Sequence, residues 1–245
     1  MHLETDGIVI REMGLGDNTK LLTFLTFDYG KITAAAKGAK SFKSKLASGA
    51  QLFAYSRINL FKLKDKYTLD SADVKDIFYE LRNDIKKISL AQYFAELVNY
   101  AAVENDECRE LLRLLLNSLF VLCKKDIDIS LIKSVFEFKA MAACGFMPDL
   151  ECCHSCNKSE NLFFCLKEGC LLCANCKIKT VEECLPLNLS VLKALRYLLK
   201  CDISKMFSFT MSDEGLKKLN IISEKYMMAH IEHKFASLDF YNNLG

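Results

Sequence analysis

The sequence predicts a multidomain α+β protein, in which a small N-terminal β-barrel is followed by a mostly helical part with an inserted cysteine-rich module. Three observations support this prediction. Short runs rich in β-branched and aromatic residues occupy residues 4–74, and the apolar residues take up helical spacing from Val74 onward. Seven of the 12 cysteines lie within residues 152–176. With 245 residues, 51% of them hydrophobic, the chain is long enough for two or three small cores.

The N-terminal runs predict five short strands. They cover residues 7–11, 21–27, 31–36, 51–61 and 67–69, and turn-forming residues at 28–30 and 64–66 separate some of them. Five strands within about 70 residues, with alternation along the fourth, favour a barrel of the OB type. An SH3-like barrel is the alternative that strand count alone leaves open. We expect the OB-type domain to occupy residues 1–76.

Helical periodicity predicts the rest of the fold. Apolar stripes cover residues 77–88, 91–102 and 111–122, and a further helix runs over 130–144, with Ser130 as its N-cap and Gly145 and Pro148 as its stop. Two more helices follow the cysteine-rich module, at 188–199 and 212–235, the second capped by Ser212. We expect a helical domain at 77–150, the module at 151–180, and C-terminal helices at 181–245 that pack on the helical domain.

The cysteines of the module are spaced as metal ligands. Cys153 and Cys156 form one C-x2-C pair, and the second pair is either Cys173 with Cys176 or Cys170 with Cys173. The first choice leaves sixteen residues between the pairs, which is typical of a zinc ribbon, and the second leaves thirteen, which is too few. We therefore expect one Zn²⁺ on Cys153, Cys156, Cys173 and Cys176. Four thiolates close the coordination shell, so that this zinc has a structural role and does not activate water.

A hairpin is expected between the two pairs, with apolar strands at 162–166 and 170–172 and a positive φ at Gly169. Cys152 and His154 are then left over, as a flanking residue and a solvated side chain, and the sequence alone does not exclude either of them or Cys170 as a substitute ligand. The cysteines outside the cluster are expected to be buried core residues: Cys108, Cys123, Cys144, Cys184 and Cys201.

No pattern in the chain predicts catalysis. A G-x4-G-K-[ST] phosphate loop is absent, and the glycine-rich residues 14–20 lead into a strand where a nucleotide-binding loop requires a helix. His230 and His233 share a helix face without an evident partner and are interpreted as solvated. The chain shows neither a signal peptide nor a membrane-spanning stretch, so we expect a cytoplasmic protein, and the absence of a catalytic pattern leads us to expect that it is not an enzyme.

Positive charge is concentrated in one segment. Residues 31–66 contain nine Lys and Arg residues and one Asp, a local charge of +8 in a chain whose total is +2. Four of these lysines and one aromatic residue lie on a single loop between two predicted strands, a combination that suits binding of nucleic-acid backbone and bases. The predicted DNA-binding residues are Lys37, Lys40, Phe42, Lys43 and Lys45 of this loop, together with Lys31, Arg57 and Lys62 of the strands.

Several segments resemble, in order and spacing, the bacterial recombination and repair proteins of the RecO family. The segments are 7–11, 18–22, 29–31, 36–40, 51–53, 81–84, 136–138, 144–150, the two cysteine pairs and 237–240. Each segment by itself is weak evidence for the family, but the order of all of them along the chain is specific to it. This chain departs from the family pattern modestly: Lys40 replaces a common arginine, Cys165 a common serine, and Cys170 a common glycine. Lysine keeps the charge at position 40 and loses the bidentate geometry of arginine.

The resemblance implies an OB fold, a helical domain, a zinc finger and a non-enzymatic role in DNA repair. Members of this family bind single- and double-stranded DNA, anneal complementary strands, and act with RecR to load RecA onto DNA covered by single-stranded-DNA-binding protein. Two other functions fit the sequence. One is an RNA-binding barrel and ribbon of transcription or translation, and the other is a thiol oxidoreductase that uses a C-x2-C pair.

Overall fold

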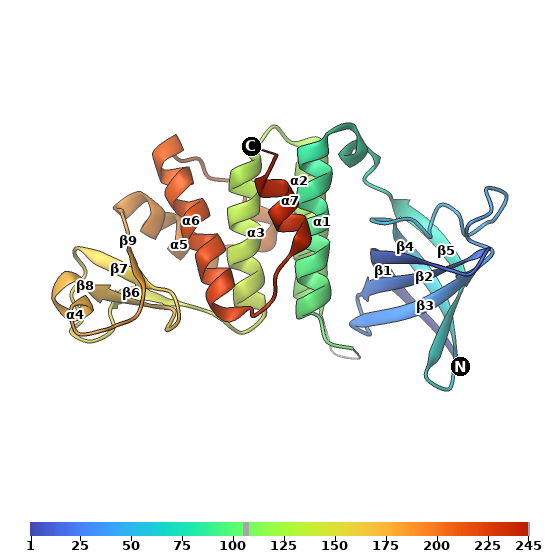
Figure 1. The fold of residues 1–245 in the computed structure, drawn as a ribbon, viewed down its shortest axis with the longest axis horizontal. Coiled ribbons are helices and arrows are strands. Elements are labelled where there is room, and N and C mark those ends of the chain that lie inside the picture. The colour runs from blue at the N-terminus through green and yellow to red at the C-terminus, as the bar shows by residue number, and fades with distance from the viewer. Residues whose placement is uncertain (105–107, 245) are drawn as a thin grey trace. The chain divides into compact units, whose positions relative to one another are not determined.

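The computed structural model describes residues 1–104 and 108–244 and divides into two compact units (Figure 1). The first unit contains residues 1–124 together with the C-terminal segment that begins at Phe235, and the second contains residues 125–234. The whole is a mixed α+β architecture, with sheets in both units. In the described part of the chain, no helix combines the length and the apolar character needed to cross a membrane.

Five strands form the N-terminal sheet: β1 (His2–Leu15), β2 (Thr19–Thr26), β3 (Lys31–Lys37), β4 (Tyr55–Leu63) and β5 (Lys66–Asp76). Their order is β1-β2-β3-β5-β4, and β4 pairs back onto β1, so that the sheet closes into a barrel. All neighbouring pairs are antiparallel except β3 and β5, which are parallel. The closed sheet therefore surrounds a single core, and the outward-facing side chains of its strands form a continuous outer surface.

The barrel core is formed by side chains that alternate along the strands. On β4, Ser56, Ile58 and Leu60 are buried, while Arg57 between them is exposed. This alternation is expected for a half-buried strand. The buried apolar side chains of β4 belong to the same core as those of the other strands, among them Leu22, Phe24, Ile32, Ala34 and Leu69. Strand alternation therefore decides which charged residues face solvent.

The fourth strand is shorter than its sequence predicts. Residues 51–54 form turns, and the strand begins at Tyr55. Phe53 adopts a positive φ of 69°, which breaks the extended backbone, and its N–H donates to the carbonyl of Val9. The predicted strand at 51–61 is thus wrong over its first four residues, because this part of the chain contacts β1 through isolated hydrogen bonds.

The first unit also contains η1 (Tyr79–Asn83), α1 (Ile85–Ala101), α2 (Arg109–Lys124) and α7 (Ala236–Asn242). The predicted stripe over 77–88 is not one helix. Asp84 is an N-cap whose carboxylate accepts from the backbone N–H groups of Lys86 and Lys87, so the regular helix starts only after it. At the other end of the chain, α7 packs on α1, and Phe235 contacts Tyr93 with ring centroids 5.7 Å apart.

The second unit contains three longer helices, α3 (Ile129–Ala143), α5 (Leu189–Lys200) and α6 (Asp213–His230), and the short η2 (Ile203–Lys205). The N-cap of α3 is Asp128, which accepts from the N–H of Ser130, so the prediction of Ser130 as the cap is wrong by two residues. The prediction of Ser212 as the cap of α6 is confirmed. The helix predicted to reach residue 235 ends at His230, and the chain then leaves this unit.

Candidate nucleic-acid interface and metal centre

The second unit carries a small sheet with the cysteine cluster at one end. Its strands are β6 (Asp149–Cys153), β7 (Leu162–Cys165), β8 (Cys170–Cys173) and β9 (Cys184–Pro186), in the order β6-β8-β7-β9, and α4 (Ala174–Lys177) follows β8. The hairpin of β7 and β8 lies between the two cysteine pairs, and Gly169 has a φ of +60°, as expected from the sequence. This hairpin brings the distant pairs to the same place.

Four sulfurs meet at this end of the sheet. The Sγ atoms of Cys153, Cys156, Cys173 and Cys176 all lie within 4.8 Å of one another, and Cys156 and Cys173 are 3.6 Å apart. Cys153 ends β6 and its carbonyl accepts from the N–H of Asn157, which closes the first turn. Cys173 is the N-cap of α4, so one helical turn returns Cys176 to it. The arrangement has the donor set of a metal site.

The four thiols are close enough to shift one another's pKa. Burial acts to raise the pKa of Cys153, but backbone hydrogen bonds at Cys173, Ser155 and Cys156 lower it to about 6. Hydrogen bonds with the sulfurs of Cys156 and Cys173 raise the pKa of Cys176 to about 12. Four sulfurs at these distances cannot all lose their protons unless a cation neutralises them, and thiolate donors select a soft metal ion.

The neighbouring side chains do not join the cluster. Cys152 hydrogen-bonds to the Oδ1 of Asn157, and His154 is 69% exposed with its Nδ1 3.9 Å from a carboxylate oxygen of Asp149. Cys170 lies buried on β8, and burial and the nearby carboxylates raise its pKa. The four cysteines chosen from spacing are therefore the ones that the structure brings together.

Cys165 and Cys184 form a disulfide between β7 and β9. Cys184 is buried, as the sequence predicts, but the disulfide is not predicted: Cys184 lies on a strand and is paired directly across the sheet with Cys165. The sequence spacing of the two residues, 19 positions, contains no signal for such a pair. The disulfide becomes evident only from the pairing of β7 with β9 in the folded structure.

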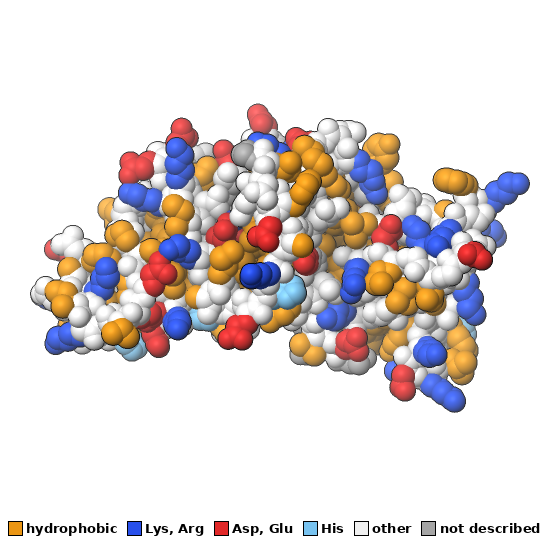
Figure 2. Space-filling view, in the orientation of Figure 1, with side chains coloured by type: hydrophobic (Ala, Val, Ile, Leu, Met, Phe, Trp, Pro, Cys, Tyr) orange, Lys and Arg blue, Asp and Glu red, His pale blue; other side chains and the backbone are white. Residues whose placement is uncertain are grey.

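The lysine loop connects β3 to β4 through a series of turns over residues 38–54. Lys37, Lys43 and Lys45 are exposed, and Phe42 is 103% exposed. Lys40 differs from them, since its Nζ donates to the carbonyl of Gly16 in the β1–β2 turn and so ties the loop to that turn. Figure 2 shows Lys and Arg side chains, with hydrophobic ones beside them, on the surface of this barrel.

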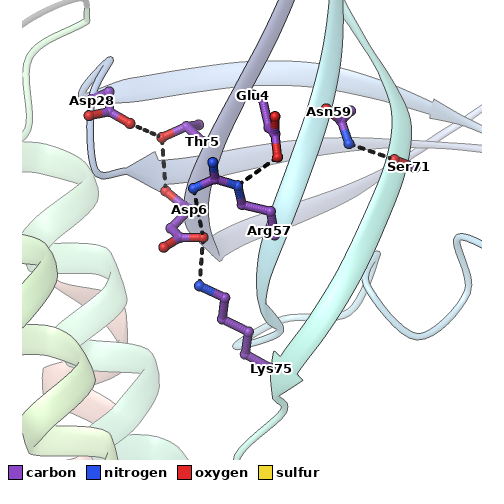
Figure 3. Close-up of polar contacts among 8 residues, drawn as sticks. All are labelled: Glu4, Thr5, Asp6, Asp28, Arg57, Asn59, Ser71 and Lys75. Carbon is purple, nitrogen blue, oxygen red and sulfur yellow. Dashed lines mark hydrogen bonds and ion pairs between the residues drawn. The ribbon is translucent and has the colours of Figure 1, made fainter.

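The other three predicted DNA-binding residues lie apart from the loop and have partners. Lys31 donates to the carbonyl of Asn99 on α1 at 2.8 Å, and Lys62 lies over the ring of Tyr67. Arg57 lies on the outer face of β1, β4 and β5, where its guanidinium contacts Glu4 at 2.8 Å and Asp6 at 3.5 Å (Figure 3). The structure does not gather these three cations with the loop lysines.

The opposite outer face, across β1, β2 and β3, has a different character. Cross-strand pairing aligns three rows: Arg11 with Thr23 and Thr33, Met13 with Leu21 and Ala35, and Leu15 with Thr19 and Lys37. None of these nine residues is acidic. We call them the β1–β3 face. Thr23 and Thr33 bring their hydroxyls to 3.4 Å, and Met13 and Leu15 are about half exposed. Arg11 is not among the residues that the sequence predicts to bind DNA, and only its strand register places it beside Thr23.

Two models of known protein families match the chain, one over the barrel and one over the part that contains the cysteine cluster. A family model described as "Recombination protein O N terminal" matches residues 1–78, and one described as "Recombination protein O C terminal" matches residues 82–239. The chain belongs to the RecO family. The N-terminal match covers the barrel, and the C-terminal match covers the helices and the cysteine cluster.

Curated RecO relatives match over almost their whole length. "DNA repair protein RecO" of Acetivibrio thermocellus is 36% identical over 245 residues, which cover 99% of this chain and 97% of the relative. The proteins of the same name from Alkaliphilus metalliredigens and Thermoanaerobacter sp. are 35% and 33% identical, and each match covers 98% or more of both chains. The similarity to a family of DNA-repair proteins therefore extends over almost the whole chain.

Proposed function

We propose that this member of the RecO family is a non-enzymatic DNA-repair mediator whose barrel is an OB fold that binds single-stranded DNA on the β1–β3 face. One observation carries the proposal: the face has Arg11 and Lys37, no carboxylate, and the lysine loop beside it, whereas Arg57 on the opposite face is neutralised by Glu4 and Asp6. The strand order β1-β2-β3-β5-β4 suits the OB type, in which strands 2 and 3 form the oligonucleotide-binding surface.

The chemistry of this surface suits binding of a single strand without sequence readout. Arg11, Lys37, Lys43 and Lys45 neutralise phosphates, and the exposed ring of Phe42 stacks on a base. Binding through phosphates leaves base edges free. Two strands whose mutual repulsion is screened in this way can pair, which is the physical basis of annealing. Double-stranded DNA binds through the same cations.

Family membership supports the wider role. We propose that the protein anneals complementary strands in the nucleoid and acts with RecR to load RecA onto DNA covered by single-stranded-DNA-binding protein. The relatives' name, DNA repair protein, supports a DNA substrate over the RNA-binding alternative. A thiol oxidoreductase is disfavoured because Cys173 and Cys176 belong to the four-sulfur cluster and Cys170 lies outside it.

We further propose that the metal is one Zn²⁺ with a structural role. Tetrahedral zinc with Zn–S bonds of about 2.3 Å places its sulfurs about 3.8 Å apart, close to the 3.6 Å between Cys156 and Cys173. Zinc on these four thiolates would supply a crosslink between the two turns and would leave no position for water. The metal would therefore stabilise the β6–β9 sheet and take no part in DNA chemistry.

A strand-annealing assay tests the DNA-binding surface. The variant Lys37→Ala/Lys43→Ala/Lys45→Ala keeps Lys40, which ties the loop to the β1–β2 turn. We expect weaker binding of single-stranded DNA, a salt dependence whose log–log slope is shallower by about 2, and slower annealing. The control, Lys158→Ala/Lys193→Ala/Lys217→Ala, removes the same charge from exposed positions of the second unit.

Equal losses of DNA affinity in the two triple variants would show that DNA binding depends on net charge alone and would contradict the proposal. Unchanged DNA affinity in the loop variant would overturn the assignment of the loop. Matched RNA strands form a further arm of the assay. Tighter binding of RNA than of DNA at every salt concentration would replace the DNA-repair proposal by the RNA-binding alternative.

A further inference from the structure

The disulfide between Cys165 and Cys184 occupies a particular place in the small sheet. Cys165 on β7 pairs with Cys184 on β9, and the N–H of Leu166 donates to the carbonyl of Glu183 next to that pair. A flanking hydrogen bond of this kind marks a non-hydrogen-bonded pair, the type in which cross-strand side chains come closest. The disulfide therefore joins β7 and β9 directly across the sheet.

The disulfide closes the segment that carries half of the metal site. Residues 166–183 lie between the two cysteines and contain both Cys173 and Cys176. The strand that ends the segment is short, since β9 has only three residues, and it pairs with β7 alone at the edge of the sheet. The end of this segment is thus held to β7 by the disulfide and by the few backbone hydrogen bonds of a three-residue strand.

The same two cysteines anchor the walls of a cavity of about 850 Å³ in the second unit. One wall is residues 166–168, directly after Cys165, and the other is residues 180–183, directly before Cys184; Lys225, Met228 and Ala229 of α6 complete the lining. The carboxylate of Glu182 accepts from the N–H of Glu168 at 2.9 Å and links the two walls a second time. The disulfide is thus a covalent crosslink between the two described walls, beside these hydrogen bonds.

We propose that the Cys165–Cys184 disulfide is a reducible staple, whose reduction by a small dithiol loosens residues 166–183 and speeds release of the metal from Cys173 and Cys176. In this step the dithiol supplies two electrons and two protons, the S–S bond breaks, two thiols form, and the dithiol becomes a cyclic disulfide. Disulfides inside cells are usually transient and redox-sensing, which suits this role. The part of the proposal that concerns metal release rests on the metal site proposed above.

Peptide mapping after alkylation tests the staple itself. The full chain is equilibrated with oxidised or reduced dithiothreitol, denatured and alkylated. We expect Cys165 and Cys184 to be blocked and linked in the oxidised sample and labelled in the reduced one, while Cys201, an unpaired cysteine of the same unit, is labelled in both. Full labelling of both residues in the oxidised sample would overturn the proposal.

Hydrogen exchange and metal release then test its consequence. In the reduced wild type and in the Cys165→Ser/Cys184→Ser variant, we expect amide exchange over residues 166–187 to be about tenfold to a hundredfold faster than in the oxidised wild type, because a loop of this length loses its closure. Zinc transfer to a chromophoric chelator should accelerate likewise, and Cys201→Ser should behave as wild type.

Equal exchange in the oxidised and reduced wild type would overturn the staple, whether or not the double variant folds. A wild-type protein purified without metal would instead contradict the metal site, and the exchange measurement would still decide whether the disulfide holds the segment.

Discussion

The buried ion network of the second unit shows how much depends on single residues. Lys133 on α3 is 1% exposed and lies 2.8 Å from a carboxylate oxygen of Glu137 and 2.6 Å from one of Glu224 on α6. Asn220 and Ser223 complete the hydrogen bonds of the group. From the sequence these residues fall on predicted helices, but nothing in the pattern indicates that a lysine and a glutamate lie in the core. Their partners are about 90 positions away along the chain.

Breaking this network should be costly. Lys133→Met leaves the carboxylate of Glu137 buried without its ammonium partner, and we expect the free energy of unfolding to fall by about 3–5 kcal/mol, measured by urea unfolding at pH 7. Lys218→Met removes the exposed partner of Glu214, at the same four-residue separation, and should leave that free energy near wild type. Similar losses in both variants would contradict the account.

The same network predicts a pH dependence. Burial acts to lower the pKa of Lys133, but Glu137 and Glu224 outweigh it and raise the pKa above 10.5. The folded protein thus holds this proton more tightly than the unfolded chain. Its contribution to stability is complete below about pH 10.5 and is lost as the pH rises through the raised pKa. We expect urea unfolding of the wild type to show this loss, and Lys133→Met to lack it.

At the scale of elements, the sequence predicts what local spacing determines. The two cysteine pairs, the hairpin with Gly169 and the cap at Ser212 all follow from short patterns, and the structure contains each of them. Features that depend on pairing between distant segments were missed or misplaced. The disulfide of Cys165 follows from the register of β7 and β9, and the late start of β4 follows from the turn at Phe53.

Arg11 and Arg57 illustrate the same limit within the barrel. Both are arginines on strands, and the sequence alone favours Arg57 because it belongs to the lysine-rich segment. The proposal above prefers Arg11 because of strand register, since Arg57 stands opposite Asp6 on β1 and Arg11 stands opposite Thr23 on β2. Sequence periodicity gives the alternation of a strand, but the neighbours across a sheet come only from the fold.

Removal of the metal should affect one element and leave another intact. With a chelator, or in Cys176→Ser, we expect the β6–β9 sheet to lose protection from hydrogen exchange because two turns lose their crosslink. The barrel lies in the other compact unit, so its protection and its affinity for single-stranded DNA should remain. Loss of DNA binding together with the metal would contradict a purely structural role for the cluster.

At the scale of the whole molecule, the two compact units carry different features. The net charge of the chain is only +2, so its total charge does not explain DNA binding. The placement of the charges matters more: the barrel sets Glu4 and Asp6 beside Arg57 and Lys75, and none of the nine residues of the β1–β3 face is acidic. The second unit carries the metal cluster and the disulfide. In the function proposed above, the barrel binds DNA and the second unit holds the structural metal.

The most direct test compares two arginines of the barrel by titration of a fluorescent single-stranded oligonucleotide. Arg11→Gln and Arg57→Gln each remove one positive charge, so a difference between them reports contact with DNA. We expect Arg11→Gln to weaken binding several-fold and to make the log–log salt slope shallower by about 0.7, the value for one phosphate contact on a single strand, with Arg57→Gln at the wild-type slope. A loss confined to Arg57→Gln would place the DNA on the opposite face of the barrel and contradict the account.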